Sequence, residues 1–395
     1  MNTYDVVIIG SGLAGLTLVK EIRKLDKDKS ILVVTSDQGE SYSKPMLSNS
    51  FSKGKLPAQL VMATAQALEK QFNIRVFNQT RVDSIDPNAQ RITVNDQYID
   101  YHQLVLATGA ECRQLPIKGK DIEEVVSIND LEDYRRFRSL AENKRRILIM
   151  GAGLIGCEFA DDLIGSDHEV HIVDPSETAL SGLIPEIAGN ALVKGLEESG
   201  VKFHFGTSVN EIIKKSDGIC AVLNNGLELD TDVVISAVGL QPNTSLAESA
   251  DISCNRGIVV NSFLETQINN IYALGDCAEI DGKVMLYVMP LMKSARALAK
   301  TVTGKRTEVQ FDAMPIATKT PSCPIVVLPP QENEGNWVFQ CNGKDVLGLY
   351  KKNDELKGFV LTNRHADLKN TLLKKLDPET PKRNPAMDLS RITPG

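Results

Sequence analysis

The sequence predicts an α/β fold made of two similar parallel-sheet domains and a small C-terminal α+β domain. Two observations predict the paired domains. An apolar strand, a glycine-rich turn and an amphipathic helix follow one another at residues 5–25 and again at 146–160, and a buried-looking strand ending at glycine lies downstream of each, at 104–109 and 232–239. Matching openings and endings indicate an internal repeat of a Rossmann-like dinucleotide-binding domain.

The second glycine-rich turn carries the fuller pattern. It comprises Gly151, Gly153, Leu154, Ile155 and Gly156. The first glycine permits the tight turn, the second lets the backbone approach a pyrophosphate, and the third lets the helix pack closely on the strand. Asp174 follows at the end of the next strand, where its carboxylate can accept from both ribose hydroxyls of a dinucleotide. A lone GxGxxG is as often a structural turn, but the complete arrangement favours a nucleotide site.

The N-terminal turn repeats the device with one departure. It comprises Gly10, Ser11, Gly12, Leu13, Ala14 and Gly15. After the next strand, 31–34, the position usually held by an acid is Thr35, followed by Ser36 and Asp37. Thr35 and Ser36 can contact a ribose or phosphate, and whether Asp37 reaches the site stays open. Two dinucleotide sites in one chain indicate hydride transfer between a nicotinamide and a flavin.

We divide the chain with the second domain inserted into the first. The division assigns 1–112 and 242–312 to the flavin domain, 113–241 to the nicotinamide domain, 313–376 to the small domain and 377–395 to a proline-containing tail that we expect to be disordered. Short strands fill 74–108, and the segments KFHFG, CAVLNN and LELD are expected to form a meander of the inserted domain. A helix should follow residue 285 and stop at Gly304.

Several local features have two interpretations. A loop lysine such as Lys44 is more often a solvated charge than a functional group. The strand ends at Thr108-Gly109 and at Gly239 either bring the backbone close to a cofactor or simply stop at glycine. Asp276, in IYALGD, suits a polyol such as a ribityl chain, or it caps a helix.

Composition narrows the function. A net charge of -7 argues against nucleic acid as the main partner. No apolar run approaches the length of about 20 residues that a membrane span needs, and a strand beginning by Asp5 leaves no room for a signal peptide, so we expect a cytoplasmic protein without membrane insertion. The seven cysteines are scattered, with no CxxC pair or metal-ligand cluster, which predicts that most of them are small buried hydrophobes in a reducing compartment and that there is no metal site.

These motifs in this order resemble the two-dinucleotide flavoprotein disulfide reductase superfamily over nearly the whole chain. Within that superfamily, the segments that most resemble the rubredoxin-reducing flavoproteins of alkane oxidation are SYSKPMLS, NDLEDYRRFR, GAGLIGCEFA, NRGIVV, IYALGDCAE, YVMPLM and TKTP. The resemblance implies FAD as cofactor, NADH as electron donor, rubredoxin as acceptor and a membrane alkane monooxygenase downstream.

The resemblance also assigns residues. FAD would contact Gly10, Ser11, Gly12, Leu13, Ala14, Gly15, Thr35, Ser36, Lys44, Pro45, Val82, Thr108, Gly109, Glu158, Asp276, Val288 and Lys319, and NADH would contact Gly151, Gly153, Leu154, Ile155, Gly156, Asp174 and Gly239. Lys44 and Glu158 would form an ion pair beside flavin N5, each justifying the burial of the other. Lys319 would face the pyrimidine edge, where its charge stabilises a reduced, anionic flavin.

Three other functions stay open. A [2Fe-2S] ferredoxin reductase shares nearly every motif. Disulfide or peroxide reduction needs a cysteine facing the flavin, and the loop 41–48 has none. A flavin-binding sensor without turnover would not need the intact second loop with Asp174. Oligomeric state and the acceptor docking surface are not predicted.

Overall fold

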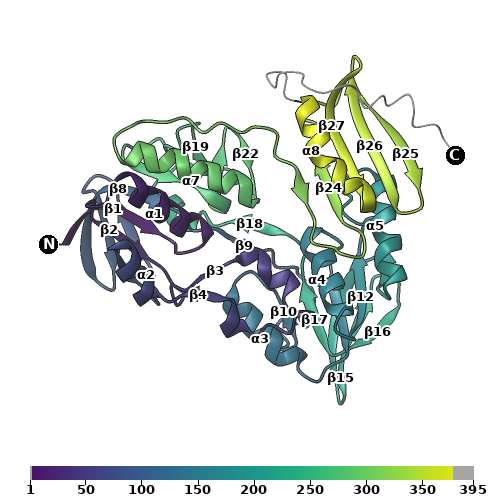
Figure 1. Cartoon of the computed structure of the whole chain (residues 1–395). Coiled ribbons are helices and arrows are strands. Elements are labelled where there is room, and N and C mark those ends of the chain that lie inside the picture. Colours follow the sequence, from purple (N-terminus) through teal and green to yellow (C-terminus); the bar gives the residue numbers. More distant parts are fainter. Residues whose placement is uncertain (1, 377–395) are drawn as a thin grey trace.

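The computed structural model describes residues 2–376 (Figure 1). The tail predicted at 377–395 lies outside the described residues. No helix within the described range is long and apolar enough to cross a membrane.

The first sheet carries the N-terminal glycine-rich turn. Its strand order is β5 (Arg75–Phe77), β2 (Ile31–Val34), β1 (Asn2–Ile9), β8 (Gln97–Leu106), β7 (Arg91–Val94) and β6 (Ser84–Asp86), with β20 (Ile271–Ala273) also paired to β8. The four pairings among β5, β2, β1, β8 and β20 are parallel. Helices α1 (Leu13–Leu25) and α7 (Val288–Val302) pack against each other, and α2 (Ala65–Phe72) contacts α1. Strand β20 thus brings residues far along the chain back to the N-terminal sheet.

The second sheet repeats this plan with five parallel strands. The order is β10 (Val125–Val126), β17 (Val233–Ser236), β11 (Arg146–Met150), β12 (Glu169–Asp174) and β13 (Lys202–Phe205). Its helices are α3 (Leu131–Ala141), α4 (Leu154–Ile164) and α5 (Glu186–Glu198). The sequence prediction for KFHFG was wrong, because β13 extends this parallel sheet. The meander consists instead of β14 (Val209–Lys215), β15 (Gly218–Leu223) and β16 (Glu228–Thr231).

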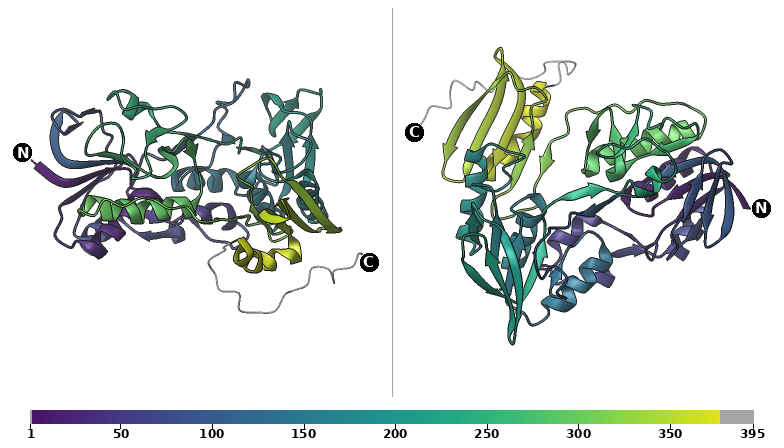
Figure 2. Two further views of the ribbon diagram at one scale, coloured as in Figure 1. Left: turned by 90° about the horizontal axis from the view of Figure 1, so that it is seen from above. Right: turned by 180° about the vertical axis from the view of Figure 1, so that it is seen from behind.

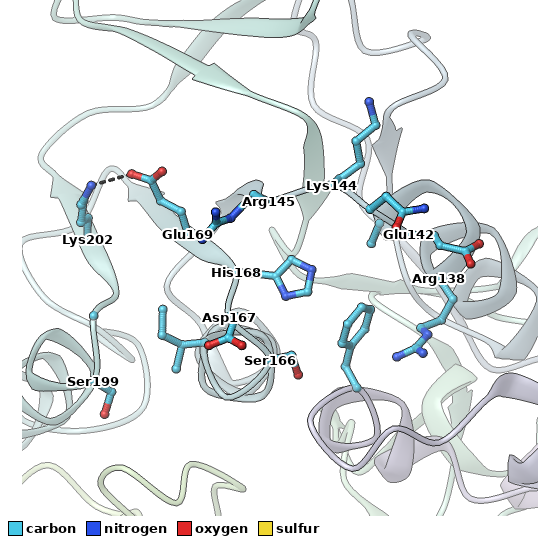
Figure 3. A pocket seen from close by; sticks show the side chains of 15 residues that line it. Arg138, Glu142, Lys144, Arg145, Ser166, Asp167, His168, Glu169, Ser199 and Lys202 are labelled. Atoms are coloured by element: carbon cyan, nitrogen blue, oxygen red, sulfur yellow. Dashed lines mark hydrogen bonds and ion pairs between the residues drawn. The ribbon is translucent and has the colours of Figure 1, made fainter.

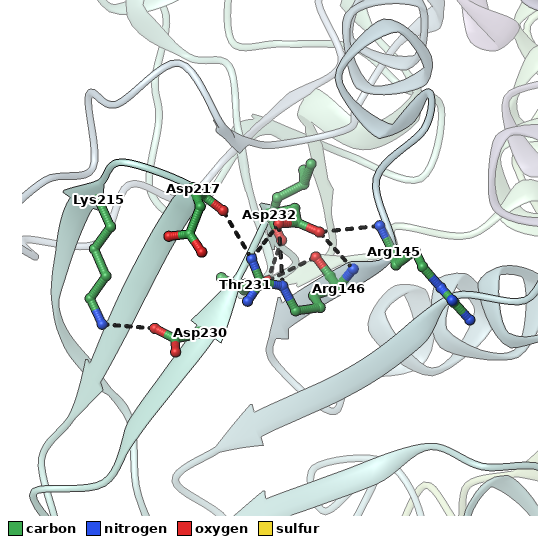
Figure 4. Close-up of polar contacts among 8 residues, drawn as sticks. Arg145, Arg146, Lys215, Asp217, Asp230, Thr231 and Asp232 are labelled. Atoms are coloured by element: carbon green, nitrogen blue, oxygen red, sulfur yellow. Dashed lines mark hydrogen bonds and ion pairs between the residues drawn. The ribbon is translucent and has the colours of Figure 1, made fainter.

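An ion pair fixes the start of the central strand of the second sheet (Figure 4). The carboxylate of Asp232 accepts from the backbone N–H groups of Arg145 and Arg146 at 3.1 and 3.0 Å, and from the Arg146 guanidinium at 2.6 Å. Burial tends to raise the pKa of Asp232, but the hydrogen bonds from Arg145 and Arg146 and the charge of Arg146 together outweigh it, and the net shift is downward. The pair therefore joins β11 to the segment that enters β17.

Two short strands connect the two sheets. Strand β9 (Ala110–Cys112) leaves the first sheet and β18 (Leu240–Pro242) returns to it, and they pair antiparallel with Gln241 opposite Glu111. Both chain crossings thus lie side by side between the domains (Figures 1 and 2). This is the arrangement expected of an inserted domain, and we keep the predicted boundaries as our proposed division.

Smaller elements surround both sheets, and the first two 3-10 helices among them contact α3 and α4 of the second domain. They are β3 (Ser41–Tyr42) with β4 (Val61–Ala63), β19 (Ile258–Val260) with β21 (Ala278–Ile280) and β22 (Lys283–Val284), the short helix α6 (Ser245–Glu248), and the 3-10 helices η1 (Lys44–Asn49), η2 (Pro57–Leu60) and η3 (Gly275–Cys277). Gly304, with φ +102°, follows α7 as the predicted stop.

The small C-terminal domain is the predicted antiparallel sheet with a closing helix. Its order is β23 (Ile316–Ala317), β24 (Ile325–Leu328), β27 (Glu355–Thr362), β26 (Asp345–Lys352) and β25 (Asn336–Asn342), followed by η4 (Asn363–Leu368) and α8 (Lys369–Leu376). Its buried residues Cys323, Ile325 and Val360 join the same hydrophobic core as α5 and β11. The small domain therefore packs on the second sheet domain, as Figure 2 shows.

Candidate active site

One cavity of about 2110 Å³ runs between both glycine-rich turns and reaches the small domain. Nearly every residue that the sequence assigned to FAD or NADH lines it; the exceptions are Gly15 and Gly156. Parallel sheets bind ligands at the carboxyl ends of their strands, and the cavity lies at those ends in both sheets. The fold thus brings together residues from 9 to 369 around one volume.

The N-terminal turn is held by backbone contacts that require glycine. Gly10 has φ +114°, and a Cβ there would collide with the carbonyl oxygen of Ala107 at the end of β8. A Cβ on Gly15 would collide with the carbonyl oxygen of Gly10, whereas one on Gly12 would meet no atom within 4 Å. The first and third glycines therefore serve packing. The second leaves open the space that a pyrophosphate would need.

The acid missing from the end of β2 is supplied two residues later. One carboxylate oxygen of Asp37 accepts from the hydroxyls of Ser11 at 3.0 Å and Thr35 at 2.8 Å, and from the backbone N–H of Gly39 at 2.8 Å. The single hydroxyl hydrogen of Ser11 is shared between Asp37 and the Thr35 hydroxyl oxygen, which also lies 3.0 Å away. The question that the sequence left open has a structural answer: Asp37 reaches the turn.

The second turn has the same backbone plan. A Cβ on Gly151 would lie 2.6 Å from the carbonyl oxygen of Ala237, and one on Gly156 would collide with the carbonyl oxygen of Gly151, while Gly153 again faces open space. Asp174 accepts from the backbone N–H of Ala152 within the turn at 2.7 Å. The acid at the end of β12 is therefore bonded directly to the glycine-rich turn.

The strand ends are structural junctions as well as cavity walls. The Thr108 hydroxyl donates to the carbonyl of Asn243 at 2.9 Å, and the Asn243 side chain donates to the Thr108 carbonyl at 2.9 Å. Gly109 and Gly239 have φ +69° and +103° and line the cavity. The two interpretations of these glycines thus hold together, because each ends a strand and presents backbone to the cavity.

The predicted ion pair between Lys44 and Glu158 was wrong. The Lys44 ammonium donates to the Asn129 side-chain oxygen at 2.7 Å, and Asn129 in turn donates to the carbonyl of Ala110 at 2.7 Å. Asn129 lies at the start of α3 and therefore anchors Lys44 to the strand that links the two sheets. The predicted partner of Lys44, Glu158, is taken by another residue.

Glu158 is paired with Lys319, which comes from the small domain. The Glu158 side chain is fully buried, and it accepts from the Lys319 ammonium, from the Lys319 backbone N–H at 2.9 Å and from the Ser48 hydroxyl at 2.6 Å. The Lys319 ammonium also donates to the carbonyl of Pro45 at 2.9 Å. A buried carboxylate is tolerated where it is paired and hydrogen-bonded, and Lys319 meets that need twice because both its backbone and its side chain reach Glu158.

Asp276 lines the same cavity as Lys44. Burial raises the pKa of its carboxyl, and the nearby charge of Lys44 opposes this shift. It lies within η3, whereas the residue that precedes α7 is Tyr287, so it does not cap that helix. Val82 is buried and Val288 half exposed, and both line the cavity.

Sequence reasoning missed three cavity or near-cavity residues: Asn129, Ser48 and Cys112. Asn129 and Ser48 stood in recognised segments, but their partners come from distant parts of the chain. Cys112 lines the cavity as a free thiol, and burial raises its pKa, which disfavours the reactive thiolate. All seven cysteines are free, and four of them are buried, in agreement with the prediction for most of them.

A second hollow, of about 980 Å³, lies at the opposite ends of the strands of the second sheet (Figure 3). Residues such as Arg138, His168 and Glu169 line it, and Glu169 is paired with Lys202 at 2.6 Å. Neither glycine-rich turn borders it. It holds none of the residues assigned from the sequence.

The residues present fit FAD at the first turn. The space over Gly12 admits a diphosphate, the Asp37 carboxylate keeps its second oxygen outside the hydrogen bonds described above, and the buried Asp276 carboxylate would accept from a polyol hydroxyl. The second turn, with Asp174, fits a dinucleotide that has free ribose hydroxyls.

The fold and its two turns define the class of reductases that hold two dinucleotides at once. Residues 4–297 match the pyridine nucleotide-disulphide oxidoreductase family model, and the chain belongs to this family. Residues 308–376 match the rubredoxin binding C-terminal domain. The protein is accordingly an FAD-dependent oxidoreductase that uses NADH.

The curated relatives are similar over nearly their full length. The chain is 45% identical to rubredoxin-NAD(+) reductase of Alcanivorax borkumensis, covering 94% of this chain and 98% of that protein. It is 37% identical to the nitric oxide reductase FlRd-NAD(+) reductase of Aliivibrio fischeri, covering 95% and 99%. The solved NAD-dependent persulfide reductase from A. fulgidus superposes with a TM-score of 0.86 at 25% identity, over 95% of this chain and 76% of that one.

Proposed function

We propose that this enzyme passes electrons from NADH through FAD to rubredoxin, one at a time. The observation that carries the proposal is the small domain: residues 308–376 match a rubredoxin binding domain, and the same segment supplies Lys319 to the cavity. The small domain that we expect to bind rubredoxin therefore also forms part of the wall of the cavity. The 45% identity to rubredoxin-NAD(+) reductase of Alcanivorax borkumensis supports the same acceptor.

The chain's own groups have distinct roles in this proposal. The first turn and Asp276 bind FAD, and the second turn and Asp174 bind NADH, so that the two ligands meet between the sheets. Holding both in one geometry removes most of the entropic barrier to hydride transfer. Bound FAD would supply the chemistry that takes electrons from NADH as a pair and delivers them singly to rubredoxin. Lys319 and Glu158 set the charge at the cavity wall beside the small domain.

The cysteines favour an iron centre over a disulfide as acceptor. Disulfide exchange needs an accessible thiolate, and burial raises the pKa of Cys112 at the cavity wall. Cys157 and Cys277 are fully buried, and burial raises their pKa values as well. We therefore expect each cysteine to be dispensable for turnover.

An anaerobic stopped-flow experiment tests the acceptor. Purified holoenzyme should lose its flavin absorbance on mixing with NADH and then reduce rubredoxin, while oxidised glutathione reacts at background rate. Cys112→Ser should reduce rubredoxin at the parent rate. A [2Fe-2S] ferredoxin turned over with a higher kcat/KM than rubredoxin would overturn the acceptor, and rapid reduction of glutathione would overturn the one-electron mechanism as well.

The pathway downstream has two candidates. We propose that reduced rubredoxin supplies a membrane alkane monooxygenase, because the cofactor-loop segments resemble reductases of that system. The 37% identity to an FlRd-NAD(+) reductase favours electron supply to nitric oxide reduction as the second candidate. A comparison of kcat/KM for a rubredoxin of an alkane hydroxylase system with kcat/KM for FlRd separates the two candidates. The value for the physiological acceptor should be higher by at least about tenfold.

A further inference from the structure

Helix α4 is hydrogen-bonded to the small domain through two acidic residues one turn apart, Glu158 and Asp161. Glu158 accepts from Lys319, as described above, and Asp161 accepts from the backbone N–H of Ser322 at 3.0 Å and from the Ser322 hydroxyl. Residues three apart on a helix lie on one face, and the two residues they hold are also three apart. Asp161 is 7% exposed, so the contact between Asp161 and Ser322 is nearly as buried as the contact between Glu158 and Lys319.

A short turn, residues 318–323, connects Lys319 to Ser322 and is held by hydrogen bonds within itself. The Thr320 hydroxyl donates to the carbonyl of Cys323 at 2.8 Å and bonds the Thr318 hydroxyl at 2.7 Å, and the Cys323 N–H donates to the Thr320 carbonyl at 3.0 Å. Both threonines are buried. Because these bonds tie residues 318–323 into one unit, the position of Ser322 fixes the position of Lys319.

Asp162, the next residue of α4, provides a contrast. Its carboxylate accepts from the backbone N–H groups of Phe51 at 2.8 Å and Ser52 at 3.0 Å, and from the Ser52 hydroxyl. It is as buried as Asp161 but holds the loop of the first domain. The same helix therefore carries one buried aspartate that holds the segment of Lys319 and one that does not.

We infer that Asp161 is a positioning residue for the reaction: by holding Ser322 it places the N–H and ammonium of Lys319 on Glu158 at the cavity wall. The inference rests on the proposed roles of Lys319 and Glu158. An error of about 1 Å in a positioned group can cost up to about a hundredfold in rate. Loosening the turn should therefore slow flavin reduction although Asp161 itself lies outside the cavity lining.

The test uses Asp161→Asn and Ser322→Ala, which without changing charge removes the hydroxyl that donates to Asp161 and accepts from Ser199 at 2.8 Å. Each variant is made in the parent holoenzyme and in Lys319→Met. The readouts are the rate of flavin reduction by NADH and the midpoint potential of bound FAD. In the parent, each change should slow reduction about tenfold and shift the potential in the same direction as Lys319→Met. In the Lys319→Met background, Ser322→Ala should change the rate by no more than about twofold and the potential by no more than the equivalent, because the ammonium being positioned is gone.

Equal effects of Ser322→Ala in the two backgrounds would show a structural role and overturn the inference, as would an unchanged rate and potential in the parent. If Lys319→Met alone changes nothing, the proposed role of Lys319 fails, and the positioning role fails with it. Asp162→Asn is the matched control. It should lower thermal stability without shifting the potential, and a shift as large as that of Asp161→Asn would also overturn the inference.

Discussion

The two glycine-rich turns are copies in their backbone and differ in how each one holds its acid. Gly10 and Gly151 donate N–H to the ends of β2 and β12, both at 2.8 Å, and both press against the end of a third strand. At the second turn, Asp174 bonds the turn backbone directly. At the first, Asp37 comes two residues late and reaches the turn through the hydroxyls of Ser11 and Thr35.

This difference shows that the glycines of the motif are restricted by space, whereas the acid is restricted only by its hydrogen-bond partners. The first and third glycines of each turn are fixed because backbone atoms occupy the space of a side chain: those of a neighbouring strand end at the first glycine, and those of the turn itself at the third. The acid has no such restriction. A carboxylate at either position serves if it lies close enough to the ribose side of the turn, provided that donors from the protein hold it in place.

The largest expected effect comes from the third glycines. Gly15→Ala and Gly156→Ala each place a Cβ against a backbone carbonyl that cannot move without its strand. Each should lower the free energy of unfolding by about 3 kcal/mol, measured by denaturant unfolding of the apoprotein. Gly12→Ala and Gly153→Ala are matched controls, since their Cβ atoms meet no atom within 4 Å. They should unfold like the parent. Equal losses at the second and third glycines would contradict the steric account.

Next in size is the choice between NADH and NADPH. Asp174 would face the extra 2′-phosphate, and two unit charges about 4 Å apart repel by roughly 4 kcal/mol at an effective dielectric near 20, less where water enters. We therefore expect kcat/KM to favour NADH by roughly ten- to a thousandfold. Asp174→Asn keeps an acceptor for the Ala152 N–H and should narrow this ratio. An unchanged ratio in steady-state kinetics would refute the role of Asp174.

A smaller effect should appear at the first turn. Asp37→Ala removes the carboxylate that Ser11 and Thr35 share but leaves their bond to each other. FAD should dissociate more readily by about tenfold, the value of roughly one hydrogen bond to a charged group, in a fluorescence titration of the apoprotein. Asp174→Asn should leave FAD affinity unchanged. If instead it weakened FAD and Asp37→Ala did not, the assignment of the two turns would have to be exchanged.

The sequence predicted what depends on local pattern and missed what depends on distant partners. Strand, turn and helix at each glycine motif were predicted because each element carries its own periodicity and its own breaker. The strand at 202–205 was misplaced because four alternating residues look the same at the edge of a parallel sheet and in a meander. The partner of Glu158 was assigned wrongly because the choice between Lys44 and Lys319 depends on where the small domain packs. No local signal near Lys44 identified Asn129 as its acceptor.

The smallest expected effect concerns β1 and β11 toward their N-terminal ends, away from the glycine-rich turns. In each of the two domains one aspartate makes hydrogen bonds in this region. Asp5 accepts from the N–H and hydroxyl of Ser30 at 2.8 and 2.7 Å, and these bonds lower its pKa. The pKa of Asp232 is also lowered, because its bonds from Arg145 and Arg146 and the charge of Arg146 together outweigh the effect of burial. A carboxyl group whose pKa is lower in the folded state contributes stability above its unfolded value, near 3.8, and loses it as pH falls through the folded value. Asp232→Asn should therefore cost about 1 kcal/mol of unfolding free energy at pH 7, and the difference from the parent should shrink below pH 3.8. Asp5→Asn should cost less, because its partners are uncharged. A cost of Asp232→Asn that stayed constant down to the acid limit of folding would show that packing, and not the charge on Asp232, holds the start of β11.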